Sequence, residues 1–218
     1  MDTAVALVQA YLNANGYFTV VEYPVVEALR NQPARSVTDL DVLAFRFAGA
    51  GHEIIRGSDA GPPGTSAFEP DPLLGWPGDR ADMIVGEVKE GAARFNAATR
   101  DARVLEVALA RFGCCRPEEA ADLTRRLLAR GQVDTPAGHT IRMVAFGAAP
   151  EGGERARWKT VSMAHVVAFL KTHLRDHWDV WRHIQTKDTT LGLLALLEKY
   201  AERSPRQTST LDGKANAQ

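Results

Sequence analysis

The segment that most constrains the fold of this 218-residue chain is the run Ala81–Gly91, Ala-Asp-Met-Ile-Val-Gly-Glu-Val-Lys-Glu-Gly. The run predicts a short buried β-strand. Because side chains alternate faces along a strand, Glu87 and Lys89 point the same way near its end. Burying an acid and a base there costs free energy unless they meet a partner, a substrate or a metal. Taken alone, the run fits either a chemical site or a strand that ends in solvent.

A second acidic residue lies within an apolar strand predicted over Asp39 to Phe47. Asp41 is followed directly by apolar residues, so its carboxylate needs a structural or chemical reason to be there. Asp39 and Asp41 could also both flank a turn. Asp82 is a rival for Asp41, and it ranks second because a regular strand points it away from Glu87.

Periodicity and turn residues predict the remaining elements. Gly49 to Arg80, with five prolines, is a long irregular stretch that could contain a short strand over His52–Arg56. The predicted helices are Thr3–Asn15, a stripe from Phe95 to Phe112, Pro117–Gly131, His165–Gln185 and a last helix through Tyr200; the further strands are Tyr17–Val26, Thr140–Ala148 and Trp158–Met163.

This order of elements predicts an α/β fold, a three-layer core with a mixed central sheet. The core is expected over residues 1–163 and a C-terminal helical pair packed on it over 164–203. Residues 204–218 are polar and are predicted to be a disordered tail.

Composition allows a nucleic-acid enzyme in the cytoplasm. The net charge is only −1, but residues 1–86 hold five Arg or Lys against eleven Asp or Glu, and residues 139–187 hold eight against four. Cys114 and Cys115 are adjacent, which predicts reduced thiols in a reducing compartment. The sequence shows no basic leader and no apolar run of the roughly 20 residues that a membrane span needs.

Two stretches, TDLDVLAFRF (Thr38–Phe47) and MIVGEVKEG (Met83–Gly91), resemble the PD-(D/E)xK nuclease superfamily. The resemblance covers roughly residues 1–147. It implies a restriction-endonuclease-like fold and a metal-dependent nuclease that hydrolyses phosphodiester bonds, of DNA more than of RNA. It also implies that Asp41, Glu87 and Lys89 are catalytic and that Asp41 and Glu87 bind Mg²⁺ or Mn²⁺.

Elementary chemistry supports this assignment. Mg²⁺ prefers oxygen ligands and usually takes only one or two carboxylates, which Asp41 and Glu87 could supply from neighbouring strands. Lys89 could orient or deprotonate the attacking water and stabilise charge on the phosphorane. The chain departs from the superfamily pattern on its first helix, where many members carry a metal-binding glutamate. Here Gln9 could substitute, or Glu22 could approach from the first strand.

Other polar residues have less specific roles. Arg94, Arg100 and Arg103, with Asn96, follow the Glu87 strand and could contact nucleic-acid phosphates or form a solvated helix face. His173 and His177 have the spacing of a zinc-ligand pair, but no obvious partner ligand follows. The three residues Trp158, Trp178 and Trp181 are expected in the core or an interface.

Two alternatives remain open at this point. The chain could be a catalytically inactive nuclease-like module that binds nucleic acid or a protein partner. It could also be an interaction protein whose Trp- and Leu-rich C-terminal helices form an oligomer, such as a homodimer.

Overall fold

A computed structural model describes residues 2–27, 33–51, 70–148, 157–183 and 186–201. In chain order its elements are α1 (Thr3–Ala14), β1 (Phe18–Glu27), β2 (Arg35–Arg46), η1 (Pro72–Leu74), β3 (Ala81–Ala92), α2 (Ala102–Arg111), α3 (Pro117–Arg130), β4 (Gln132–Asp134), β5 (His139–Ala148), β6 (Lys159–Ser162), α4 (Met163–Asp176), α5 (Trp178–Trp181) and α6 (Thr189–Ala201).

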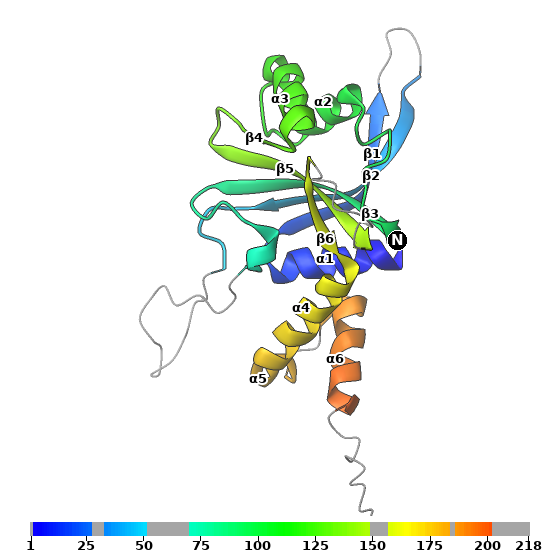
Figure 1. The fold of residues 1–218 in the computed structure, drawn as a ribbon, viewed down its shortest axis with the longest axis vertical. Helices are drawn as coiled ribbons and strands as arrows, with labels where there is room; N and C mark the ends of the chain where they lie inside the picture. Colours follow the sequence, from blue (N-terminus) through cyan, green and yellow to red (C-terminus); the bar gives the residue numbers. More distant parts are fainter. Residues whose placement is uncertain (1, 28–32, 52–69, 149–156, 184–185, 202–218) are drawn as a thin grey trace, which may run out of the picture.

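The centre of the structure is a six-stranded mixed sheet (Figure 1). Its order is β1-β2-β3-β5-β4, and β6 pairs with β5 on the same side as β4. The pairs β1–β2, β2–β3 and β4–β5 are antiparallel, whereas β3–β5 and β5–β6 are parallel. The parallel step from β3 to β5 crosses over through α2 and α3, as a parallel connection requires.

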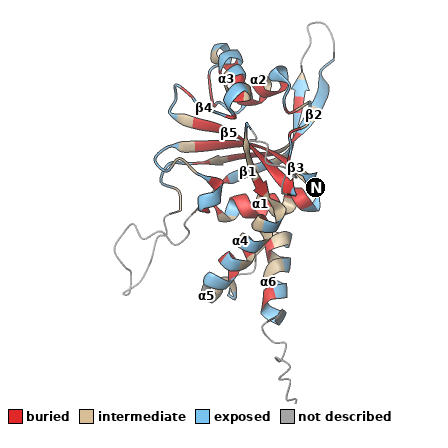
Figure 2. Cartoon of the chain, viewed as in Figure 1, coloured by how far each residue is buried: buried red, intermediate tan, exposed pale blue. Residues whose placement is uncertain are grey.

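Helices cover both faces of the sheet, and each face has its own apolar core. α2 and α3 pack on one face through residues such as Leu105, Leu109 and Leu123. α1 and α4 cover the other face through residues such as Val8, Leu12 and Leu170 (Figures 1 and 2). The predicted three-layer α/β architecture is therefore confirmed.

Two predicted helices need correction, and one strand was missed. The helix expected from Phe95 begins only at Ala102, because residues before it form a turn in which Asn96 Oδ1 accepts the Thr99 N–H at 2.7 Å. The helix expected over 165–185 is interrupted at His177, which ends α4 before the short α5. The three-residue strand β4 was not predicted, since it is too short to show a pattern. The expected strand at 52–56 and the tail at 204–218 lie outside the described residues.

The hairpin β1–β2 bends at Glu22 and Asp41, which lie opposite each other between the backbone pairs Val21–Val42 and Tyr23–Leu40. On β2, Val42 packs in the α1-side core and Leu40 in the α2-side core, although a regular strand would give both the same face. On β1, Glu22 has φ +50, a left-handed conformation that is uncommon for a residue other than glycine. The outer half of the hairpin therefore curls toward α2, where Tyr23 contacts Phe112 edge-on with ring centroids 4.9 Å apart.

On the face of the sheet that α1 covers, a buried ion pair joins β3 to β5. The Asp82 carboxylate accepts Nε–H and Nη2–H of Arg142 at 2.8 and 2.6 Å, and it also accepts the Tyr17 hydroxyl at 2.5 Å. Arg142 Nη1 donates to the carbonyls of Leu74 and Gly75. Arg142 thus neutralises the Asp82 carboxylate within the core, on the face of the sheet opposite Glu87.

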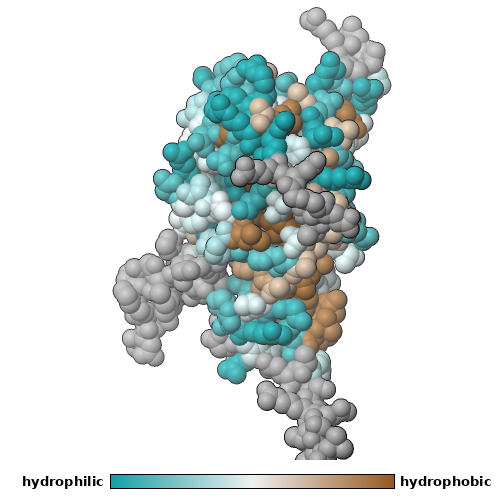
Figure 3. Space-filling model, in the orientation of Figure 1, coloured by the Kyte–Doolittle hydropathy of each residue, from teal (hydrophilic) through white to brown (hydrophobic). Residues whose placement is uncertain are grey.

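The C-terminal helices pack on α1 only in part. Leu191 is buried there, and Glu198 on α6 pairs with Lys171 and Arg175 of α4 at 3.3 and 2.7 Å. Four large side chains of α6 stay exposed and form an apolar strip, visible as brown surface in Figure 3: Leu193, Leu196, Leu197 and Tyr200. Across the described part of the chain, no helix has both the length and the apolar character that crossing a membrane requires.

Removing Arg142 should destabilise the fold severely. Arg142→Met leaves the Asp82 carboxylate buried without its counter-charge, which costs about 3–5 kcal/mol of unfolding free energy. Arg80→Met breaks the exposed ion pair with Asp134, in which both side chains are about half exposed, and should cost no more than about 1 kcal/mol. Urea denaturation of the two variants checks this, and equal losses would contradict the role given to Arg142.

Candidate active site

The candidate site lies where β2 separates from β3. The backbone pairing of the two strands ends at Val42 and Gly86. One residue further on, the Asp41 side chain replaces the missing strand partner, and its Oδ2 accepts the Val88 N–H at 2.8 Å. The bend of the hairpin thus turns a carboxylate toward the end of β3, where Glu87 and Lys89 lie.

Lys89 connects the two predicted metal ligands. Its Nζ lies 2.5 Å from Glu87 Oε1 and 3.8 Å from Asp41 Oδ2. The exposed fractions of the side chains are 36% for Lys89, 25% for Asp41 and 1% for Glu87. The three residues that the sequence predicted as catalytic therefore converge at one point, with one cationic and two acidic groups at the edge of the buried region.

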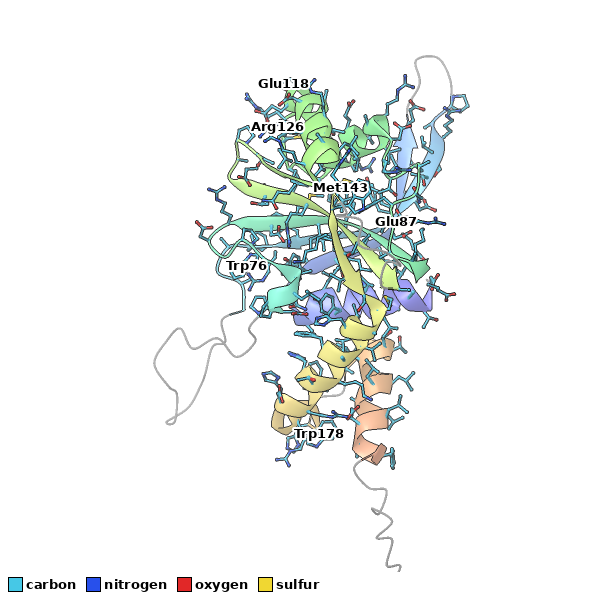
Figure 4. The ribbon with its side chains drawn as sticks, in the orientation of Figure 1. Trp76, Glu87, Glu118, Arg126, Met143 and Trp178 are labelled. Carbon is cyan, nitrogen blue, oxygen red and sulfur yellow. The ribbon has the colours of Figure 1, made fainter. Side chains whose placement is uncertain are left out.

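Glu87 is held on its other side by the segment between β3 and α2. Asn96 Nδ2 donates to Glu87 Oε1 at 2.7 Å, and the Thr99 hydroxyl donates a short hydrogen bond to Oε2. Thr99 is itself buried. A carboxylate held by an ammonium, an amide and a hydroxyl is fixed in one orientation, which is the condition a preorganised site needs. Figure 4 shows Glu87 toward the end of β3.

The Asp41 carboxylate lies in an unfavourable electrostatic position. Burial raises its pKa most strongly; the Val88 N–H and Lys89 lower it, while the charges of Glu87 and Asp2 raise it further. The net effect is a pKa above the ordinary aspartate value. Ionised Asp41 therefore costs the folded state free energy at neutral pH, and a ligand of positive charge would offset this cost.

The two accessory candidates differ in their position. Glu22 has φ +50 and lies opposite Asp41 in the hairpin, between the backbone pairs Val21–Val42 and Tyr23–Leu40. Its Oε1 accepts the Asp2 N–H at 3.2 Å. Gln9 instead donates to the Thr19 hydroxyl at 3.2 Å. Thr19 pairs with Ala44, three residues along β2 from Asp41. Glu22 therefore lies closer to Asp41 along the hairpin than the contact of Gln9 does, and Asp2, to which Glu22 is hydrogen-bonded, is the further acid whose charge acts on Asp41.

The three arginines predicted to contact nucleic acid all lie on or beside the segment that holds Glu87. Arg94, Arg100 and Arg103 are exposed, and Arg100 Nε donates to the Asn96 carbonyl at 3.2 Å. Because α2 starts at Ala102, Arg94 and Arg100 come from the preceding loop and not from the first turn of a helix. Arg100 is thus attached to the loop that holds Glu87, whereas Arg103 lines a surface pocket together with Glu27 and Arg35 of the hairpin.

Asp41 and Glu87 carry the kind of oxygen ligand that a hard divalent cation prefers. The two carboxylates come from two strands. Asp41 Oδ1 receives no hydrogen bond among the described ones, whereas both Glu87 oxygens already accept one, from Asn96 and from Thr99. Mg²⁺ commonly binds through only one or two carboxylates, with waters and phosphate completing its shell. Within the described residues, no group of three or more His, Cys, Asp or Glu side chains could hold a metal ion, so a cation at this point would rely on two carboxylates.

Other polar residues considered from the sequence lie elsewhere. Asp82, the rival of Asp41, is committed to Arg142 on the opposite face. His173 is buried with its ring stacked on Phe169, and burial lowers the pKa of its imidazole to about 4. Trp158 packs edge-on against Phe95, with ring centroids 5.1 Å apart, in agreement with the core position expected for it.

Sequence reasoning missed the role of Thr99 and a second polar cluster. The pattern Asn-x-x-Thr after a strand is a turn signal that could have located Asn96 and Thr99. In the cluster, Asp71 accepts the Tyr11 hydroxyl at 2.8 Å and lies 2.5 Å from His165 Nε2. Burial raises the pKa of Asp71, but the hydrogen bonds from His165, Leu73 and Tyr11 lower it overall. No local pattern marks contacts so distant in sequence.

Comparison with known proteins identifies no relative: no family model matches the chain, and neither the curated proteins nor the solved structures contain a match.

Replacing Asp41 should stabilise the protein at neutral pH. In Asp41→Asn the amide oxygen can still accept the Val88 N–H, but the buried charge is gone. Because the pKa of Asp41 is higher in the folded than in the unfolded chain, the protonated carboxyl favours folding. This contribution is fully present below the unfolded pKa, near 3.9, and is lost as pH rises through the folded pKa. Urea unfolding should therefore favour the variant at pH 7, and the difference should shrink toward pH 4. A variant less stable than wild type at pH 7 would refute this account of Asp41.

Proposed function

We propose that this chain is a metal-dependent nuclease that hydrolyses phosphodiester bonds, with DNA preferred over RNA. The observation that supports it best is the convergence of Asp41, Glu87 and Lys89 at the fork between β2 and β3. This convergence agrees with the resemblance of TDLDVLAFRF and MIVGEVKEG to the PD-(D/E)xK superfamily. Membership in that superfamily is part of the proposal.

Each residue of the site has a chemical role in this proposal. Asp41 and Glu87 would hold Mg²⁺ or Mn²⁺, which would polarise the phosphate and lower the pKa of a bound water. Lys89 is one-third exposed and so can reach a substrate; its ammonium would orient the attacking water and stabilise negative charge on the phosphorane. Asn96 and Thr99 keep Glu87 in place, since both donate to its carboxylate.

Three exposed arginines that follow β3 support a nucleic-acid substrate. Arg94, Arg100 and Arg103 project from the segment that carries Asn96 and Thr99, so phosphates on either side of the scissile bond would meet guanidinium groups. Glu22, beside Asp41 on β1, would complete the acidic side of the site in place of the glutamate that many superfamily members carry on the first helix.

The alternative function is a catalytically inactive module that binds nucleic acid or a protein. One observation favours it: α1 itself contains no Asp or Glu, so its only carboxylate near Asp41 is that of the cap residue Asp2. The other candidate ligand on this helix, Gln9, is hydrogen-bonded to Thr19. Metal affinity and cleavage together separate the two functions, since an inactive module would bind nucleic acid without cutting it.

The cleavage test uses purified chain with Mg²⁺ or Mn²⁺ on double-stranded DNA, single-stranded DNA and RNA. Wild type should cut DNA faster than RNA, and Lys89→Ala should lower the rate by roughly 10²-fold or more, the usual loss for a group that handles the reacting proton. Glu87→Gln should abolish both cleavage and Mn²⁺ binding, measured by electron paramagnetic resonance.

The matched control is Glu90→Gln, which changes an exposed glutamate on the same strand and should leave the rate unchanged. The proposal fails if wild type cuts none of the three substrates, or if Lys89→Ala cuts as fast as wild type. Mn²⁺ binding without cleavage would assign the chain to the inactive alternative.

We also propose that the chain forms a homodimer through the apolar strip on α6. Leu193, Leu196 and Leu197 are each more than half exposed, which is unfavourable for three neighbouring leucines in water. Light scattering should give twice the chain mass of 23.8 kDa for wild type and the monomer mass for Leu196→Lys/Leu197→Lys. Monomeric wild type would rule this assembly out.

A further inference from the structure

A second site lies at the outer edge of β5, two strands away from the candidate active site. β4 pairs with β5 only as far as Arg142, and β6 begins its pairing at Val144. Between them the Met143 N–H donates to the Gly131 carbonyl at 2.8 Å. A surface pocket of about 190 Å³ opens at this gap between the two short strands. Figure 4 labels Met143 in the middle of the sheet.

The lining of this pocket is strongly basic. Arg130, Arg142, Arg157 and Lys159 all contribute to it, and none of its described lining residues is Asp or Glu. Arg142 is neutralised by Asp82, as described above. Arg157 Nη1 donates only to the Leu128 carbonyl, at 3.3 Å, and for Arg130 and Lys159 the described residues provide no hydrogen bond or ion pair. Among the described residues, these three positive charges therefore have no ion pair, although the more distant carboxylate of Asp71 attracts Lys159.

Two glycines allow these cations to come so close. Gly131 ends α3 with φ +76, and a Cβ there would lie 2.4 Å from the Arg157 carbonyl oxygen. Gly75 has φ +66, and a Cβ there would lie 3.0 Å from Lys159 Nζ. The chain of residues 157–159 is thereby brought against the end of α3 on one side and the turn after η1 on the other.

The ammonium of Lys159 lies in an environment that disfavours its charge. Burial lowers the pKa of Lys159, and the nearby Arg142 lowers it further, although Asp71 acts in the opposite direction. A bound anion would reverse this effect. An adjoining hollow of about 350 Å³ is lined by Arg126 and Arg130. Arg126 is paired with Asp122 at 3.6 Å, and Asp134, the carboxylate among the described lining residues, is paired with Arg80. Figure 4 shows Arg126 on α3.

We propose that this pocket binds a phosphoryl group. Guanidinium groups match phosphate oxygens in paired hydrogen bonds, and several cations around a small cavity suit a compact, multiply charged anion more than a large apolar ligand. The phosphoryl group is that of a nucleic-acid end or of a free phosphate compound. The site is independent of the proposed cleavage, because β5 separates β6 from β3 and neither Glu87 nor Asp41 is among the described residues that line the pocket.

The test is isothermal titration calorimetry with inorganic phosphate and pyrophosphate, without divalent metal and at constant ionic strength. Wild type should bind one anion per chain. Arg157→Gln/Lys159→Gln should weaken binding tenfold or more, since each lost partner is a charge-assisted hydrogen bond. Arg130→Gln, a single exposed change, should also weaken it. Arg125→Gln, which alters an exposed arginine of α3 outside the pocket, is the control and should bind as wild type does.

Oligonucleotides with and without a 5′-phosphate identify the source of the anion. Tighter binding of the phosphorylated form would assign the pocket to nucleic-acid ends, whereas binding of pyrophosphate alone would assign it to a free phosphate compound. Absence of phosphate and pyrophosphate binding by wild type, or an equal loss in Arg125→Gln, would overturn the proposal. Glu87→Gln should retain anion binding, so that failure of the proposed nuclease function is distinguishable from failure of this site.

Discussion

The hydrogen bond from the Val88 N–H to Asp41 Oδ2 is the interaction on which the candidate site depends. β2 must leave β3 for the hairpin to curl over α2, and this separation would leave backbone groups of β3 without a strand partner. A carboxylate in that position satisfies the N–H and is held near Glu87 and Lys89. The Asp41 side chain thus has two effects: it accepts the hydrogen bond of a backbone N–H that lacks a strand partner, and it brings a second carboxylate close to Glu87.

The acids on the two faces of the sheet differ in how far their negative charge is paired with cations. On the α1 side, Asp82 is fully neutralised by Arg142 and Tyr17, so its contribution is to stability. On the α2 side, Glu87 shares one ammonium with Asp41, which leaves an excess of negative charge. A buried acid whose charge is fully matched holds a structure together, whereas an incompletely matched pair can take up a cation.

The sequence predicted the elements and the site better than the contacts that complete them. Alternation along β3 was sufficient to place Glu87 and Lys89 on one side, because strand periodicity is a local property. The position of Asp41 relative to them depended on the hairpin bend, which follows from the left-handed φ of Glu22 and leaves no mark in periodicity. The helix start after Phe95 was wrong because side-chain hydrogen bonds of Asn96 competed with an apolar stripe.

The backbone of Glu22 has an evolutionary consequence. Its left-handed conformation costs about 1–3 kcal/mol, a cost that glycine would not incur. Selection for thermal stability alone would therefore favour glycine at position 22, whereas selection for a function of the site between β2 and β3 would keep the carboxylate. The residue found at position 22 in natural variants of this chain would thus record which of the two pressures has acted on it.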